Sequence, residues 1–228
     1  DLPLIFTIGL FQMAMMMSLA NYGLSLVGAG KANFLAFTVS VWIIPISAFL
    51  TRKISLLEGV SFFIGLLGMG CLIKLWNIED SPLWRGYLVL LLSALSWAVG
   101  ILCGRHMIWH RPIIQLLPWQ LLLATACTIA IAQFQNIPFL PRTVDLIFLG
   151  SLLYTGIISI AIGYWLLNLV GKHLPPATTS LGLLFVPIIA FCISVVFLHE
   201  QISLNIVAGV ILITLGSLIH IFSEKNSN

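Results

Sequence analysis

The sequence has very few charged residues. Only 7% of its 228 residues are charged, seven acidic and ten basic, whereas 60% are hydrophobic and the mean hydropathy is +1.12. A soluble domain carries roughly 25% charged residues, so these few cannot cover the surface of a water-soluble protein. The composition excludes a soluble enzyme, a nucleic-acid-binding domain and a disordered chain, and it predicts a polytopic membrane protein. The net charge of +3 is too small to predict a polyanionic partner.

The sequence also lacks the patterns of disulfides, metal sites and catalytic clusters. Its four cysteines lie in or beside apolar runs without CxxC spacing, which favours reduced packing residues. Its five histidines fall in loops or near helix ends without a repeated ligand spacing. No catalytic triad or glycine-rich phosphate loop stands out. We therefore expect no catalytic residue, no metal and no cofactor.

Eight hydrophobic segments are long enough to cross a bilayer as helices. A span needs about 20 apolar residues, because lipid cannot satisfy backbone polar groups. None of the segments alternates polar and apolar residues with period two. The predicted fold class is therefore an all-α integral membrane protein with eight transmembrane helices. The predicted spans are 3–27, 31–50, 55–76, 86–105, 112–133, 144–170, 174–198 and 202–223.

Lysine and arginine residues in the short loops predict the orientation in the membrane. Six of them lie on the side of the C-terminus and four on the opposite side, which places both ends of this chain in the cytoplasm. We therefore expect a multi-pass protein of the inner or plasma membrane with a cytoplasmic tail, 224–228. The six are Arg52, Lys53, Arg105, Arg111, Lys172 and Lys225, and the four are Lys31, Lys74, Arg85 and Arg142.

An internal repeat links the third and the eighth predicted helix. Residues 54–73 align with residues 202–221 without a gap and with six identities. Because the eighth helix comes five positions after the third, an odd displacement, the two units lie in the membrane with opposite orientations, as in the inverted repeats of transporters.

The two units of this repeat have different lengths. The second, 86–223, contains five helices; the first, 1–76, contains three; and 77–85 connects them. The repeat therefore predicts two further helices before Asp1 and a ten-helix, 5+5 fold, and a start without an initiator methionine agrees with this expectation.

Several segments of the second unit resemble the EamA repeat of the drug/metabolite transporter superfamily. They are GYLVLLLSALSWAVGILCGR (86–105), PWQLLLA (118–124), the long segment 152–203 and VAGVILITLGSLI (207–219). In the first unit, GAGKANFLAFTVSVW (28–42) resembles the back part of the first repeat. The resemblance implies ten helices in two inverted repeats, a central cavity, and export or exchange of small metabolites, often amino acids.

Two departures from the family pattern concern helix ends and packing. The usual LGE after the ninth helix is LHE here, at residues 198–200. In the first unit, Arg52 and Lys53 replace the corresponding acid, and Ser40 replaces the usual proline.

Polar and aromatic residues inside the spans are the candidate substrate ligands. Asn21 and Tyr22 lie on one face of the first helix with Ser18 and Ser25. These residues are suited either to bind a substrate or to join helices, and the packing role is favoured for the two serines. Cavity and core positions remain equally open for Trp42, which shares a helix face with Thr38.

Later spans add further candidates. Trp97 stands within a stripe of small residues, Ser93, Gly100 and Gly104, and a cavity position is favoured for it. Trp119 and Gln120 lie a third of the way into their helix, and an interhelical hydrogen bond is the favoured role of Gln120. On the sixth helix, Tyr154 and Thr155 are modest candidates. An N-terminal cap is the favoured role of residues 178–180, and a kink is the simpler role of Pro187.

The predicted function is export or exchange of small organic metabolites by alternating access. Trp42, Trp97 and Tyr154 would suit amino acids or related amphipathic compounds. The middle third of the spans contains no charged residue, so a coupling acid lies elsewhere or the protein is a facilitator or exchanger. The expected partners are the lipid bilayer and a small-molecule substrate, with the protein a monomer or homodimer. The alternatives are a non-transporting membrane subunit and a membrane-embedded lipid-modifying enzyme.

Overall fold

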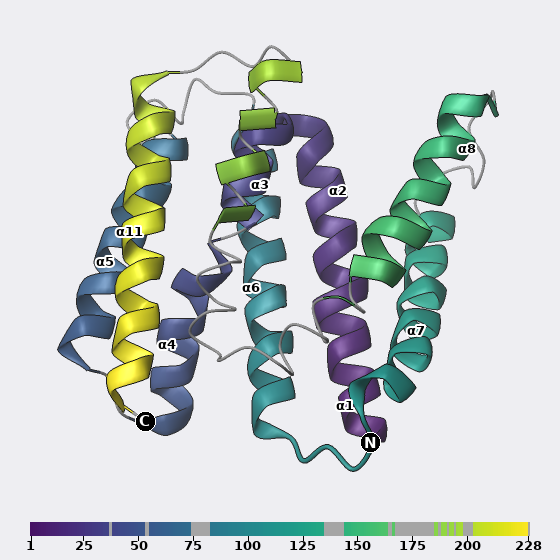
Figure 1. The fold of residues 1–228 in the computed structure, drawn as a ribbon, viewed down its shortest axis with the longest axis horizontal. Coiled ribbons are helices and arrows are strands. Elements are labelled where there is room, and N and C mark those ends of the chain that lie inside the picture. Colours follow the sequence, from purple (N-terminus) through teal and green to yellow (C-terminus); the bar gives the residue numbers. More distant parts are fainter. Residues whose placement is uncertain are drawn as a thin grey trace.

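The computed structural model describes 1–36, 38–52, 55–73, 83–134, 144–163, 166, 185–186, 188–190, 192–193, 195–197 and 203–227. Within these ranges the regular elements are all helices, which confirms the predicted all-α class (Figure 1). Six helices have the length and composition to cross a membrane, and two shorter apolar helices, Leu146–Ile162 and Ile188–Phe197, accompany them. These eight segments correspond to the eight predicted spans.

The first span is one continuous helix with a wider segment near its beginning. It consists of α1 (Leu2–Thr7), the π-helical segment η1 (Ile8–Met15) and α2 (Met16–Val27). The helix ends at Gly28, whose φ of 98° and ψ of 159° are unfavourable for a residue with a side chain. Glycine at this position allows the chain to reverse direction directly into the second span.

The second span is interrupted, whereas a single helix was predicted. It consists of α3 (Ala29–Ala36) and α4 (Val39–Thr51), and Thr38 between them has a ψ of 0°. The Thr38 hydroxyl donates to the carbonyl of Leu35 at 2.6 Å, and the Thr38 amide donates to the same carbonyl. These local bonds satisfy a backbone group that would otherwise be left over at the break.

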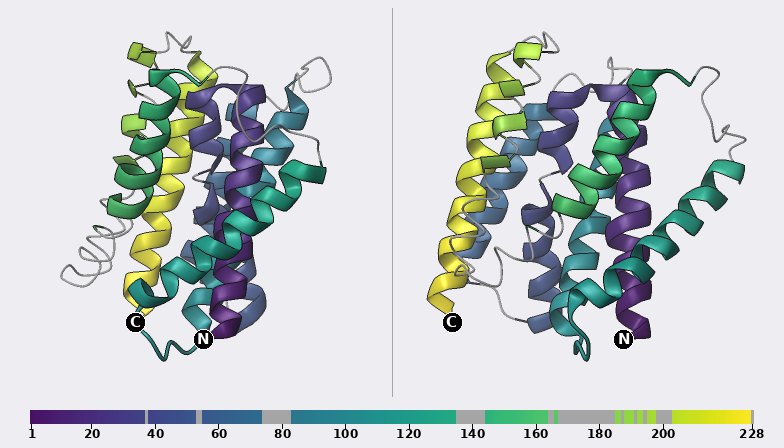
Figure 2. Two further views of the ribbon diagram at one scale, coloured as in Figure 1. Left: turned by 90° about the vertical axis from the view of Figure 1, so that its right-hand side faces the viewer. Right: turned by 45° about the vertical axis from the view of Figure 1, so that its right-hand side comes forward.

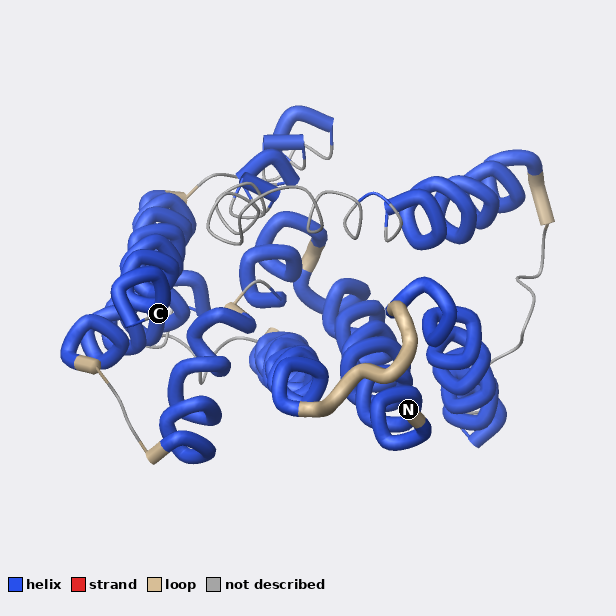
Figure 3. The backbone as a smooth tube through the Cα atoms, turned by 60° about the horizontal axis from the view of Figure 1, so that its bottom comes forward, coloured by secondary structure: helices blue, strands red, loops and turns tan. Residues whose placement is uncertain are grey.

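The helices are arranged around α6 (Trp84–His106), with both chain ends at the same end of the bundle (Figure 1). α6 contacts η1, α2, α3 and α4, whereas α5 (Leu56–Ile73) and α11 (Leu204–Ser227) pair beside α4. α7 (Ile113–Phe134) begins against α1 and then leans away from α2 (Figure 2). α8 (Leu146–Leu153) and η3 (Tyr154–Ile162) stand apart and contain no buried residue (Figure 3).

The α5–α11 pair is packed through glycines at very short distances. A Cβ atom added at Gly68 would lie 2.9 Å from the carbonyl oxygen of Gly209 and 2.9 Å from the amide nitrogen of Ile213. One added at Gly216 would lie 3.0 Å from the carbonyl oxygen of Ser61 and 3.2 Å from the amide nitrogen of Gly65. Small residues of this kind allow transmembrane helices to approach closely.

These contacts are reciprocal in the numbering of the internal repeat. The gapless alignment pairs position 61 with 209, 65 with 213, and 68 with 216. The third position of each helix therefore contacts two groups of the other helix, the carbonyl of the first position and the amide of the second. Such mutual contact is the geometry of a local two-fold axis.

Serine hydroxyls complete the packing of α5 and α11. Ser61 is buried and donates to the carbonyl of Gly216 at 2.6 Å. Near the other end of the pair, the hydroxyls of Ser55 and Ser223 lie 2.9 Å apart. Ser55 and Glu58 also form a capping box, in which the Ser55 amide donates to the carboxylate at 2.8 Å and the Glu58 amide donates to the hydroxyl at 3.1 Å. Glu58 therefore has a structural role at the start of α5.

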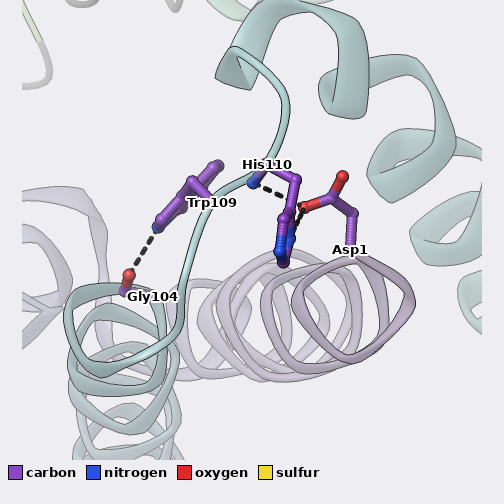
Figure 4. A network of polar contacts seen from close by, with 4 residues as sticks. All are labelled: Asp1, Gly104, Trp109 and His110. Atoms are coloured by element: carbon purple, nitrogen blue, oxygen red, sulfur yellow. Dashed lines mark hydrogen bonds and ion pairs between the residues drawn. The ribbon is translucent and has the colours of Figure 1, made fainter.

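The loop between α6 and α7 closes the end of the bundle where the chain begins. The Trp109 indole donates to the carbonyl of Gly104 at 2.7 Å and so satisfies a backbone group at the end of α6. The His110 amide donates to the carboxylate of Asp1 at 3.0 Å (Figure 4). The loop thus links α6 to the start of α1.

Candidate functional site

The eight predicted substrate residues do not form one site in the described part of the chain. Trp42 and Trp97 share an apolar cluster between α4 and α6, and Thr38 lies buried at the interruption of the second span. Four residues are exposed on α2 and η3, namely Asn21, Tyr22, Tyr154 and Thr155. Trp119 borders a separate groove.

Trp42 and Trp97 are the predicted residues that the fold brings together. Both are partly buried and pack against the same cluster, which consists of Val39, Ile43, Ala98 and Leu102. Ala98 is fully buried, and its small side chain allows α4 and α6 to approach each other.

The indole nitrogen of Trp42 has no hydrogen-bond partner among the described residues. Its Nε1 atom is shielded from solvent, so it is not paired with water at the surface either. Buried tryptophan N–H groups usually find a partner, because leaving one unpaired in an apolar environment costs about 1–3 kcal/mol. An unpaired donor of this kind can bind the carboxylate or carbonyl of a small molecule.

Trp97 packs against a different helix from the small residues that share its stripe in the sequence. Gly100 contacts Gln12, and Gly104 contacts Ile8, so these glycines face the first span. Ser93 faces it too, and its hydroxyl donates to the carbonyl of Met16 at 2.8 Å. The small residues therefore pack α6 against the first span, whereas Trp97 packs in the cluster with α4.

Thr38 is fully buried, and its hydroxyl is engaged. The only proton that it can donate goes to the carbonyl of Leu35 in the preceding turn. This geometry supports a role in holding the interruption of the second span. Direct binding of a substrate by Thr38 remains a sequence-based prediction.

The polar residues of α2 and η3 are accessible. Asn21 is exposed, Tyr22 and Tyr154 are 59% and 61% exposed, and Thr155 is exposed as well. The Ser25 hydroxyl bonds to the carbonyl of Tyr22, in agreement with a role in its own helix. Exposed polar side chains on membrane helices indicate either a water-filled path or contact with further protein.

Trp119 lies in a different place from the other tryptophans. It is 60% exposed and borders a groove of about 590 Å³ between α1 and α7, together with Phe6 and Leu122. Arg111 and Gln115 line the end of the groove nearest the chain start. The prediction that Trp119 joins the same site as Trp97 therefore finds no support in the arrangement of the helices.

Gln120 differs from its sequence-based prediction. An interhelical hydrogen bond was expected, but its side chain is fully buried and neither amide atom has a partner in the described structure. A polar residue within an apolar span is the signal in the sequence, and this signal does not distinguish a paired amide from an unpaired one.

Other sequence-based predictions concern residues that lie outside the described ranges. They include the helix start at residues 178–180, Pro187, the LHE sequence and Lys53. Within the described ranges, no group of three or more His, Cys, Asp or Glu side chains is placed to hold a metal ion.

The sequence of this chain is similar to those of known membrane transporters. Residues 84–222 match the EamA-like transporter family. The uncharacterized transporter YoaV of Bacillus subtilis (strain 168) is 28% identical over 215 residues, which cover 91% of this chain and 71% of YoaV. An uncharacterized transporter of Archaeoglobus fulgidus is 25% identical over 227 residues, covering 95% of this chain and 76% of that protein. A protein of Salmonella typhimurium named "probable amino-acid metabolite efflux pump" is 23% identical over 228 residues, covering 96% of this chain and 75% of that protein.

Proposed function

The chain belongs to the EamA-like transporter family, and on that premise we propose that it exports or exchanges amino acids or related amphipathic metabolites by alternating access. The observation that carries this proposal is the unpaired indole N–H of Trp42 beside the cluster that Trp97 also joins. The name of the Salmonella typhimurium relative supports the choice of substrate class.

The two indoles would bind complementary parts of a zwitterion. The Trp42 N–H would donate to the substrate carboxylate, where a hydrogen bond to a charged group contributes about 1.5–3 kcal/mol. The Trp97 ring would offer its face to the ammonium group or to an apolar side chain. Asn21, Tyr22, Tyr154 and Thr155 are accessible and remain candidates for lining the path.

The α5–α11 pair would act as the pivot of the transport cycle. Its reciprocal contacts support two inverted units, 1–76 and 86–223, joined by 77–85 in a ten-helix arrangement. The backbones at these glycines are so close that an added Cβ atom would lie within about 3 Å of the other helix, which supports a contact that stays closed. The two units would then rock about this contact, opening the α4–α6 side alternately to each face of the membrane.

The basic residues support a cytoplasmic position for both ends of this chain. Arg52 at the end of α4, Arg105 in the last turn of α6 and Arg111 before α7 lie at the end of the bundle that contains the chain termini (Figure 1). Lys31 and Arg85 lie in the first turns of α3 and α6, at the opposite end (Figure 1). Because cytoplasmic loops are richer in lysine and arginine, we propose that the end with the termini faces the cytoplasm of a cell with an inner or plasma membrane.

The test is counterflow of labelled amino acids into proteoliposomes that contain the full-length protein. We expect exchange above that of empty liposomes, a reduction of about 10-fold or more in Trp97→Ala, and normal exchange in the control Trp84→Phe. Trp84 is 46% exposed at the start of α6, with the Arg85 guanidinium 5.6 Å from its ring, away from the cluster. No exchange of any amino acid would contradict the substrate class. Exchange unaffected by Trp97→Ala would contradict the site and favour a different path.

A further inference from the structure

Gln120 is the most deeply buried unpaired polar side chain in the described structure. Its exposed fraction is 0%, and both Nε2 and Oε1 lack a partner. Its neighbours on the inner face of α7, Leu117 and Ala124, belong to an apolar cluster with Ile8 and Met13 of η1. A primary amide has two donors and an acceptor, and leaving them unpaired in such surroundings is unfavourable. An apolar residue would be more stable here, so Gln120 requires an explanation from another state of the protein.

The segment that packs against Gln120 is the π-helical η1. At Gly9 the backbones approach closely, and a Cβ atom added there would lie 3.1 Å from the main-chain carbonyl oxygen of Gln120. On its other side, η1 is held by α6: the Ser96 hydroxyl donates to the carbonyl of Phe11 at 2.7 Å, and that of Ser93 donates to the carbonyl of Met16 at 2.8 Å. One side of η1 thus has hydrogen-bond donors in use, and the other has an amide that is not in use.

We propose that Gln120 is a gating residue: η1 changes between π-helical and α-helical register during transport, and the Gln120 amide pairs with main-chain groups of η1 in the register not seen here. This inference rests on the proposed function, because it supplies the conformational step of that transport cycle. π-helical turns are uncommon and occur frequently at functional sites.

The register change would move α1 against α7. When the wide π-helical turn returns to α-helical register, it contains one residue fewer. The chain before η1 then rotates by about 100° relative to α2. α1 carries Asp1, to which the α6–α7 loop is bonded through His110, so the closed end of the bundle would follow this rotation. η3 is a second π-helical segment, on the sixth span.

The test compares Gln120→Met with Gln115→Met in the full-length protein. Methionine matches the length of glutamine but removes the amide. Gln115 is an exposed glutamine on the same helix, which makes it a matched control. We expect Gln120→Met to raise Tm by about 3 °C or more, since it removes the unpaired amide from this state. We also expect the maximal exchange rate to fall about 10-fold or more, with KM within about two-fold of the unmodified protein. Gln115→Met should leave all three values unchanged.

Three outcomes would overturn the proposal. An unchanged or lower Tm in Gln120→Met would mean that the amide is already paired. A higher Tm with an unchanged exchange rate would mean that the amide is not used during transport. A raised KM with a normal maximal rate would make Gln120 a substrate ligand instead.

Backbone hydrogen exchange separates this inference from the proposed function, because it needs no substrate. We expect the amides of Ile8–Met15 to exchange faster than those of Met16–Val27, and Gln120→Met to slow the exchange of Ile8–Met15 about five-fold or more. Equal exchange in the two segments, or no effect of Gln120→Met, would overturn the register change even in a protein that transports amino acids. The expected exchange pattern in a protein without measurable transport would support the register change and contradict only the substrate class.

Discussion

The α5–α11 and α4–α6 interfaces differ in whether their polar side chains have hydrogen-bond partners. Between α5 and α11, Ser61 donates to a main-chain carbonyl, Ser55 pairs with Ser223, and glycines bring the backbones into contact. Between α4 and α6, two large indoles pack against the cluster that contains Ala98, and the Nε1 atom of Trp42 is unpaired among the described residues.

This difference separates stability from function within one bundle. Paired hydroxyls and close backbones leave little freedom to move, which suits a fixed contact. An unpaired donor lowers the stability of the protein without ligand, and its partner must then come from outside the chain. The following predictions measure each side of this difference, beginning with the largest expected change in stability.

The largest effect is expected at the closest contact of the α5–α11 pair. Gly68→Leu should lower the free energy of unfolding by about 3 kcal/mol or more, since its Cβ atom would meet backbone atoms that cannot move aside. Denaturant unfolding of the purified protein in detergent measures this change. Gly59→Leu on the same helix is the control, because a Cβ atom added at Gly59 meets nothing within 4 Å. Equal effects of the two substitutions would show that the close contact does not stabilise the protein.

A smaller effect is expected from the hydroxyl that joins the same helices. Ser61→Ala should lower the free energy of unfolding by about 1 kcal/mol, because it removes the bond to the Gly216 carbonyl without changing the packing. The same unfolding titration applies. A loss within error of zero would mean that glycine packing alone holds the pair.

The smallest change in stability is expected at the tryptophan pair, where the change in affinity should instead be large. Trp42→Phe should alter the free energy of unfolding by less than about 0.5 kcal/mol, because removal of the unpaired N–H offsets the apolar contacts that are lost with the smaller ring. Substrate binding, measured by the ligand-induced rise in Tm, should weaken about 10-fold or more. A large loss of stability with normal binding would show that the α4–α6 interface stabilises the protein and does not bind the substrate.

Composition and hydropathy were sufficient to predict the spans, because span length and apolar content are set by the bilayer. The equivalence of 54–73 and 202–221 was also visible in the sequence, and their reciprocal packing agrees with it. The interruption at Thr38 was not predicted, since a threonine hydroxyl bonded to Leu35 achieves it without proline or glycine at that position. The π-helical segments were missed as well, because apolar periodicity in lipid carries little information on register.

The candidate site was predictable only residue by residue. Trp42 and Trp97 could each be singled out as aromatic residues inside a span, but their common cluster depends on how α4 packs on α6. Trp119 has the same residue type and similar surroundings in sequence, yet it lies in the groove beside α1. Whether a buried polar group is paired depends on the neighbouring helix, so the unpaired state of Gln120 required the structure.

The close packing of α5 with α11 also has a consequence for biogenesis. Ser61 and Gly216, which are hydrogen-bonded, lie 155 positions apart in the sequence, and several helices lie between α5 and α11 along the chain. Contacts between distant parts of a chain form late, after the intervening segments have been made. The α5 glycines therefore stay without their partner until α11 has been synthesised and inserted. A chain that stops short of α11 would present this unpaired helix face to the quality-control proteases of the membrane, so that molecules without α11 are removed.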